Sequence, residues 1–132
     1  MATITCFEDI VAWQKARELA KDIWCLTANE PISKDFSLID QIRRSSGSVM
    51  DNIAEGFERG GNKEFIQFLS YSKESLGETK SQLYRAFDRN HINQKTFDNQ
   101  FLKINELENM IGGLMRYLKN SKIKGTKFNT NQ

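Results

Sequence analysis

Basic side chains are the residues of this sequence whose placement most readily suggests chemistry, because each can neutralise a phosphate group of RNA or DNA. Two arginines are adjacent, a third ends the same predicted helix, and four lysines cluster near the C-terminus: Arg43, Arg44, Arg59, Lys119, Lys122, Lys124 and Lys127. We predict that these residues contact nucleic acid, and a ring of identical chains would multiply such contacts around an axis. The alternative is that they are ordinary solvated surface charges.

Polar residues also recur every three or four positions through the helix that carries these arginines: Gln41, Arg44, Ser48, Asn52, Glu55 and Arg59. This spacing places them on one helix face, opposite the apolar core line. We interpret Ser48, Asn52 and Glu55 as a surface that orders the helix or contacts another subunit. A solvated face, in which Glu55 and Arg59 form an ion pair one turn apart, is the alternative.

Residue patterns for catalysis or metal binding are missing from the sequence. His91 is the only histidine, it lies in a predicted interhelical loop where we expect it to be exposed, and no Glu-x-x-His or Cys-x-x-Cys motif occurs. A nucleophile elbow and a glycine-rich phosphate loop are also missing. We therefore expect no catalytic residue, no bound metal and no cofactor. A small enzyme or metal protein would require a polar pocket with convergent ionisable groups.

The two cysteines indicate reduced thiols. Cys6 and Cys25 lie nineteen residues apart at or near the first predicted helix, which would separate them by ~28 Å, whereas a disulfide needs a Cα separation of roughly 4.4–6.8 Å. No run approaches the roughly 18 apolar residues of a membrane span, and the N-terminal residues lack the pattern of a secretory signal. We therefore expect a cytoplasmic protein with no membrane partner.

Four amphipathic helices must position these residues. The 132 residues include one proline and eight glycines, and apolar residues recur at helical spacing in four segments, at about 8–28, 37–59, 63–90 and 96–119. Strand signals are absent. Because the connections are short and the last two segments follow a 3.5-residue repeat, the sequence predicts an all-α, antiparallel up-down-up-down four-helix bundle over 1–118. A basic, flexible C-terminal tail is expected over 119–132.

Several positions on these helices predict tertiary contacts. The apolar face of helix 8–28 is about 160° wide, against the ~100° that a surface helix needs, and it includes Trp13 and Trp24. We therefore expect this helix to contact another subunit as well as its own core. Small residues at 45–48 and the glycine pair at 112–113 predict close helix approach or a bend. Asn62 follows two glycines that end a helix, and it is expected to cap the next one.

The segment 41–56, QIRRSSGSVMDNIAEG, resembles the signature of the four-helix bundle family encoded in bacterial 23S rRNA intervening sequences. The opening segment with WQKA at 13–16, KEF at 63–65 and the later SLGE and QL are also similar, so the resemblance covers roughly 7–118. The sequence departs from the family pattern at 45–51, where a proline that would kink the helix is missing.

This resemblance implies a left-handed antiparallel bundle that assembles as a homopentamer. The related accessory protein of diversity-generating retroelements is a basic pentameric barrel that works with a reverse transcriptase and nucleic acid. For the intervening-sequence family itself the biochemical function is not established, and nothing in the family points to catalysis.

These observations favour a non-enzymatic, ring-forming helical bundle of unestablished role that binds RNA or DNA electrostatically. The net charge is only +2, and residues 1–118 carry two more acidic than basic side chains, so the positive excess lies in the tail. A near-neutral bundle favours a second hypothesis, a protein–protein interaction scaffold with no nucleic-acid role.

Overall fold

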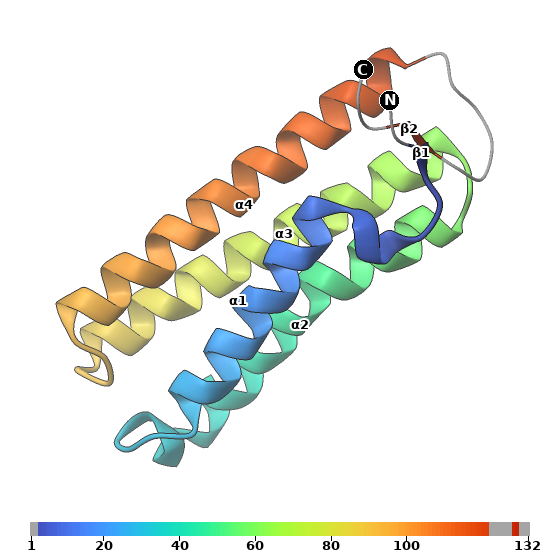
Figure 1. The fold of residues 1–132 in the computed structure, drawn as a ribbon. Helices are drawn as coiled ribbons and strands as arrows, with labels where there is room; N and C mark the ends of the chain where they lie inside the picture. The colour runs from blue at the N-terminus through green and yellow to red at the C-terminus, as the bar shows by residue number, and fades with distance from the viewer. Residues whose placement is uncertain (1–2, 122–127, 130–132) are drawn as a thin grey trace.

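Four long helices lie side by side and alternate in direction (Figure 1). The computed structural model describes residues 3–121 and 128–129, and the helices are α1 (Val11–Thr27), α2 (Phe36–Glu58), α3 (Asn62–Asp88) and α4 (Gln94–Asn120). The α1–α2 and α3–α4 connections lie at one end of the bundle, and the α2–α3 connection lies at the other. The prediction of an all-α, antiparallel four-helix bundle is confirmed.

Short elements flank the long helices. The 3-10 helices η1 (Phe7–Asp9) and η2 (Ile32–Lys34) precede α1 and α2, and strand β1 (Thr3–Ile4) pairs antiparallel with β2 (Phe128–Asn129). Each strand has two residues, which is too short to show apolar alternation in the sequence, and the pair leaves the all-α class unchanged. The helix α4 continues through Lys119 to Asn120, two residues past the predicted end of the bundle at residue 118.

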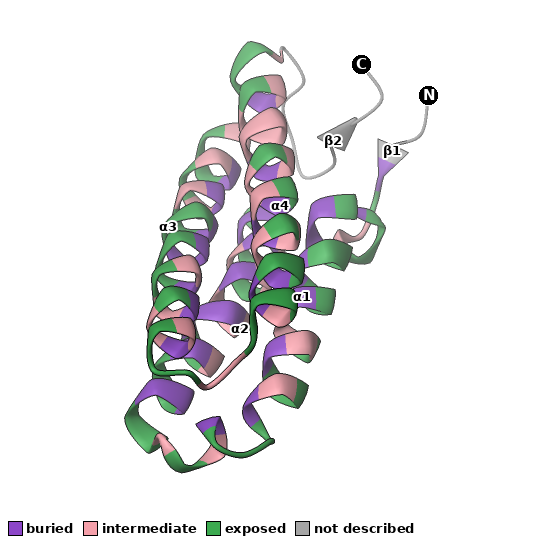
Figure 2. Ribbon diagram, turned by 90° about the vertical axis from the view of Figure 1, so that its left-hand side faces the viewer, coloured by how far each residue is buried: buried purple, intermediate pink, exposed green. Residues whose placement is uncertain are grey.

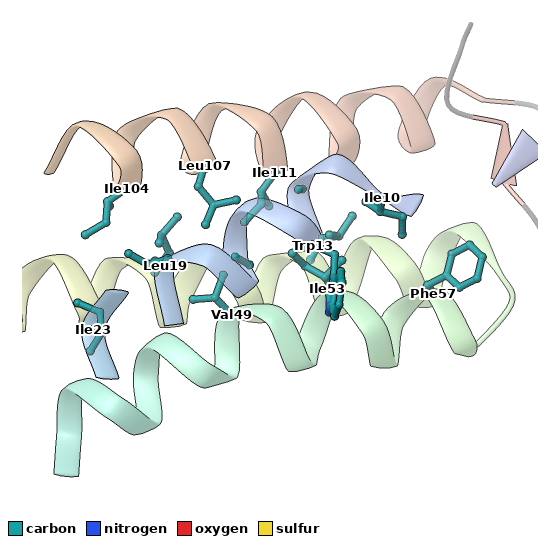
Figure 3. Close-up of a cluster of buried hydrophobic side chains, with 14 of the residues drawn as sticks. Ile10, Trp13, Leu19, Ile23, Val49, Ile53, Phe57, Ile104, Leu107 and Ile111 are labelled. Atoms are coloured by element: carbon teal, nitrogen blue, oxygen red, sulfur yellow. The ribbon is translucent and has the colours of Figure 1, made fainter. Parts of the chain in front are cut away.

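The apolar faces of the helices are buried within the bundle (purple in Figure 2), where they form one large cluster and a smaller one that contains Ile32 and Leu38. On α2 the predicted core line is buried: Leu38, Ile42, Ser45, Val49, Ile53 and Phe57. Figure 3 shows side chains from α1, α2 and α4 meeting in this core. α2 packs most extensively on α3, whereas α1 and α4 pack more sparsely on each other. The α2–α3 pair is therefore the best-packed part of the bundle.

Of the two helix-end signals predicted from the sequence, the glycine stop after α2 is confirmed and the Asn62 cap is not, and Asn93 provides a cap that was not predicted. α2 ends at Glu58, and Gly60 then takes the left-handed conformation with φ 88°. Asn93 caps α4, because its side chain accepts a hydrogen bond from the Thr96 backbone N–H at 2.8 Å. The predicted Asn62 cap is wrong. Asn62 is already inside α3, and its Nδ2 donates to the Leu118 carbonyl at 3.3 Å, which joins the start of α3 to the end of α4.

Close helix approach occurs at a glycine that the sequence did not single out. A β-carbon added at Gly56 would lie 2.6 Å from the β-carbon of Phe68, so α2 and α3 require a glycine there. A β-carbon at Gly47 would meet nothing within 4 Å, and at 112–113 it would meet only the Arg116 side chain. These glycines therefore do not mark close packing between helices.

Candidate functional site

An open groove of about 620 Å³ lies where the C-terminal end of α1 meets the N-terminal part of α2. Its lining combines aromatic, apolar and charged side chains, among them Trp24, Thr27, Phe36, Ile39, Asp40, Arg43 and Arg44. Two of the predicted nucleic-acid residues thus share this groove with a tryptophan that was predicted to make a surface contact. We call the groove that these side chains line the α1–α2 groove.

Arg43 is held in a fixed orientation by two contacts to α1. Its Nε donates to Thr27 Oγ1 at 2.8 Å, and its guanidinium carbon lies 3.8 Å from the centroid of the Trp24 ring. Thr27 is fully buried and in turn donates to the Ile23 carbonyl at 2.7 Å. The result is a guanidinium stacked on an indole ring at the wall of the groove, in a cation–π arrangement.

Arg44 has greater freedom than Arg43. Its Nε donates to Asp40 Oδ1 at 3.1 Å, one turn earlier on α2, and its side chain is 80% exposed. Such exposed ion pairs contribute only about 0–1 kcal/mol. Because a guanidinium carries five N–H donors, Arg44 can keep Asp40 as a neighbour and still bind an anionic group in the groove.

Two large aromatic side chains of the groove are mostly exposed: Trp24 at 60% and Phe36 at 77%. The other tryptophan, Trp13, is only 9% exposed and packs edge-on against Phe7 at 5.1 Å between centroids. Figure 3 places Trp13 within the core. The expectation that Trp13 contacts another subunit is therefore corrected, because the ring is used inside its own chain, and Trp24 is the tryptophan that faces solvent.

Two of the remaining predicted basic residues, Arg59 and Lys119, lie far from the groove. Arg59 caps the other end of α2, roughly 22 Å along the helix from Arg44, and Lys119 is in the last turn of α4 at that same end. Arg59 bonds Glu55 Oε1 at 3.0 Å, as the spacing predicted, and its guanidinium lies 4.9 Å from the Phe68 ring centroid. Lys122, Lys124 and Lys127 lie outside the described residues.

Ser48 and Asn52 make their hydrogen bonds within the bundle. Ser75 Oγ of α3 donates to Ser48 Oγ at 3.0 Å, and Asn52 Nδ2 donates to both the carbonyl and the Oγ of Ser48 at 2.9 Å. Thr79 Oγ1 donates to Ser45 Oγ at 2.8 Å, and Ser45 Oγ donates to the Gln82 amide oxygen at 2.6 Å. We call this set the α2–α3 polar seam: Ser45, Ser48, Asn52, Ser75, Thr79 and Gln82. It joins two helices, so the interpretation as a wholly solvated face is wrong for these positions.

A charged cluster joins the start of α2 to the α3–α4 connection. Asp35 Oδ2 accepts hydrogen bonds from Arg89 Nη1 and from His91 Nε2, both at 2.8 Å. The hydrogen bond from His91 is the largest cause that lowers the pKa of the Asp35 carboxyl below its ordinary value, and the bond from Arg89 lowers it further. The His91 side chain is 14% exposed, so the prediction of an exposed loop histidine is wrong. The His91–Asp35 contact joins the α3–α4 connection to the start of α2.

Phe36, Asp40 and Thr27 are groove residues that the sequence analysis did not identify. Phe36 lies one position before the predicted start of its helix and off the apolar core line, so an off-pattern aromatic residue was the available signal. Thr27 carried no such signal, because its role depends on the side chain of Arg43, which comes from the next helix.

No described helix is long and apolar enough to cross a membrane. Within residues 3–121 and 128–129, no three histidine, cysteine, aspartate or glutamate side chains are grouped so that they could hold a metal ion. Both cysteines are free, as predicted.

The fold and the groove define a four-helix bundle protein with an arginine–aromatic surface at one end. Residues 8–113 match the family described as 23S rRNA-intervening sequence protein, so the chain belongs to that family. Comparison with curated proteins gives no match. Among solved structures, a protein of unknown function from the S23 ribosomal protein family of Bacteroides thetaiotaomicron has a similar fold. Its TM-score is 0.73 and its identity 22%, over 80% of this chain and 98% of that one. None of these comparisons establishes a biological role.

Proposed function

We propose that this protein is a non-enzymatic, cytoplasmic homo-oligomer, specifically a homopentamer, that binds RNA or DNA through phosphate contacts. The observation that carries the proposal is the α1–α2 groove, where Arg43 and Arg44 lie beside two exposed aromatic rings. Arginines interleaved with aromatic rings are typical of surfaces that bind nucleic acid. The resemblance of the family to the accessory protein of diversity-generating retroelements supports the same proposal.

A single chain offers few phosphate contacts, and oligomerisation would increase their number. One chain presents Arg44 at one end of the bundle and Arg59 with Lys119 at the other, and neither group is large. A ring of parallel subunits would repeat Arg44 around one face and Arg59 with Lys119 around the other. The number of phosphate contacts per assembly would then rise with the number of subunits, and affinity would rise with it.

Charge reversal at Arg44 tests this proposal. Arg44→Glu is expected to weaken binding to structured RNA and DNA several-fold at low salt, because a phosphate contact is replaced by repulsion. The side chain is 80% exposed, so the fold should be retained. Lys73→Glu, on an exposed position of α3, makes the same change of net charge away from the groove. Equal effects of the two substitutions would contradict a role for the groove, and absence of binding at low salt would contradict the function.

A protein-interaction scaffold is the second candidate. It is favoured by the near-neutral charge of the bundle and by the exposure of Trp24 beside Arg43, since tryptophan and arginine are enriched at interface hot spots. A multimeric native mass together with no binding of RNA or DNA at low salt would support this candidate over the first.

A further inference from the structure

We infer that the α1–α2 groove binds an unpaired nucleobase against Trp24, so that the nucleic acid bound there is single-stranded. The inference rests on the proposed function and adds the mode of recognition. Electrostatic attraction alone does not distinguish a duplex from a single strand, whereas an aromatic ring that stacks on a base does, because a paired base is already stacked within its helix.

The first support is the geometry around Trp24. The ring already has one planar partner, the Arg43 guanidinium 3.8 Å from its centroid, and Trp24 is nevertheless 60% exposed. Arg43 is fixed by its bond to Thr27, so the stack is ordered before a ligand arrives. A base that stacks on the exposed part of the indole extends this arrangement without an added ordering cost for Arg43.

The second support is the combination of groups in one groove. Its volume of about 620 Å³ lies within the roughly 300–1,000 Å³ typical of small-molecule sites. Phe36, 77% exposed, offers a second ring, and Arg44 offers donors for a phosphate oxygen. A nucleotide needs both kinds of group, an apolar surface for its base and a cation for its phosphate.

Charge complementarity favours a nucleotide over other occupants. The lining carries two arginines against the single carboxylate of Asp40, so the groove suits an anion. An acidic peptide would pair with the arginines and leave both aromatic rings uncovered. An apolar helix, including one from a second copy, would cover the rings and leave Arg44 to be desolvated without a new partner, which is costly.

Tryptophan fluorescence provides the test, because the chain has two tryptophans and only Trp24 is exposed. The probes are oligoadenylate as RNA and as DNA, the duplex of the DNA form with oligothymidylate, and an abasic oligonucleotide of equal length and charge. We expect the single strands to quench the emission and to bind more tightly than the abasic strand. Trp24→Ala should weaken single-strand binding by about 5- to 150-fold and should weaken abasic binding less, because only the single strand loses a stacked base.

Leu102→Ala is the matched control, since Leu102 is 68% exposed on α4 and does not line the groove. Circular dichroism should show that both variants keep their helices. If the abasic strand or the duplex binds as tightly as the single strand, without quenching, the inference is wrong while the proposed function survives. If no probe binds, both fail. Emission that changes with protein concentration but not with oligonucleotide would identify the groove as a subunit contact and overturn the inference.

Discussion

Gly56 is the residue of α2 at which the lack of a side chain matters most. Its buried position faces Phe68 and Phe65 of α3, and an added β-carbon would lie 2.6 Å from one and 3.0 Å from the other. One of these contacts is to a β-carbon, which cannot move without its helix. The packing of α2 on α3 therefore depends on this position.

Gly56→Ala is expected to lower the free energy of unfolding by about 1–3 kcal/mol, as overpacking of a filled core does. Gly47→Ala is the matched control on the same helix, because its new methyl group would meet nothing within 4 Å. There, higher helix propensity should raise stability by up to about 1 kcal/mol. Urea unfolding of the two variants measures both values, and equal effects would contradict the described α2–α3 packing.

The Asp35 carboxylate makes the stability of the fold depend on pH. Its pKa is lowered by hydrogen bonds from His91 and Arg89, so the ionised form is favoured in the folded state. The stabilisation is present above the ordinary pKa of an aspartate, roughly 4, and is lost as the pH falls through the lower folded value. Wild type should therefore exceed Asp35→Asn in stability near neutral pH, and the difference should shrink as the pH is lowered below roughly 4.

Thermal unfolding across an acid pH series measures this difference. Asp51→Asn is a suitable control, because Asp51 is exposed on α2 and lies outside the cluster. If the gap between wild type and Asp35→Asn persisted unchanged at the acid end, the carboxylate bonds would not be the source of the stabilisation.

The α2–α3 polar seam joins the two best-packed helices through hydrogen bonds between side chains. Thr79 is fully buried, and the single hydrogen of its hydroxyl has two acceptors within reach, Ser45 Oγ at 2.8 Å and the Ser75 carbonyl at 2.9 Å. Gln82 accepts from Ser45. The seam thus sets the register of α2 against α3 with directional contacts that an apolar interface would lack.

Thr79→Val should destabilise the fold by roughly 1–3 kcal/mol, since a buried hydroxyl of Ser45 loses its donor. Ser45→Ala should also be destabilising. The double variant should cost less than the sum of the two single ones, because both partners of the bond are then gone. A double-mutant cycle by denaturant unfolding measures the coupling, and strictly additive effects would show that the hydroxyl pair contributes nothing.

The sequence predicted the elements well and the contacts between elements less well. Helical periodicity placed all four helices within a few residues of their ends, and Leu38, Ile42 and Val49 are buried as expected. Periodicity states which face is buried but not which helix covers it. Ser75, Asp35 and Thr27, which bond Ser48, His91 and Arg43, lie on other elements than the residues they bond, so these contacts became visible only in three dimensions.

For the candidate site too, the sequence indicated several of the residues but not which of them come together. Arg43, Arg44 and Trp24 were identified from residue type and spacing, and the structure brings them together in one groove. Arg59 was grouped with them because it lies on the same helix, but a 23-residue helix separates the two ends too widely for one site. The sequence did not indicate Phe36, because this residue belongs neither to the apolar core line nor to the polar face of its helix.

Across the bundle, the predicted phosphate-binding residues that the structure describes form two separate groups, one at each end. The α1–α2 groove lies at one end, and Arg59 with Lys119 lies at the other. Each group alone offers few phosphate contacts. Assembly into a ring would instead join equivalent ends of neighbouring chains into a repeated surface.

The salt dependence of RNA binding by the 132-residue chain tests most sharply whether it binds nucleic acid through phosphate contacts. Phosphate contacts release counterions, so the logarithm of the association constant should fall linearly with the logarithm of salt concentration. For a single strand the slope should be roughly −0.7 for each phosphate contacted by the assembly, and therefore steeper than a single chain could give. A slope near zero, or no binding in low salt, would show that the protein does not bind RNA through phosphate contacts.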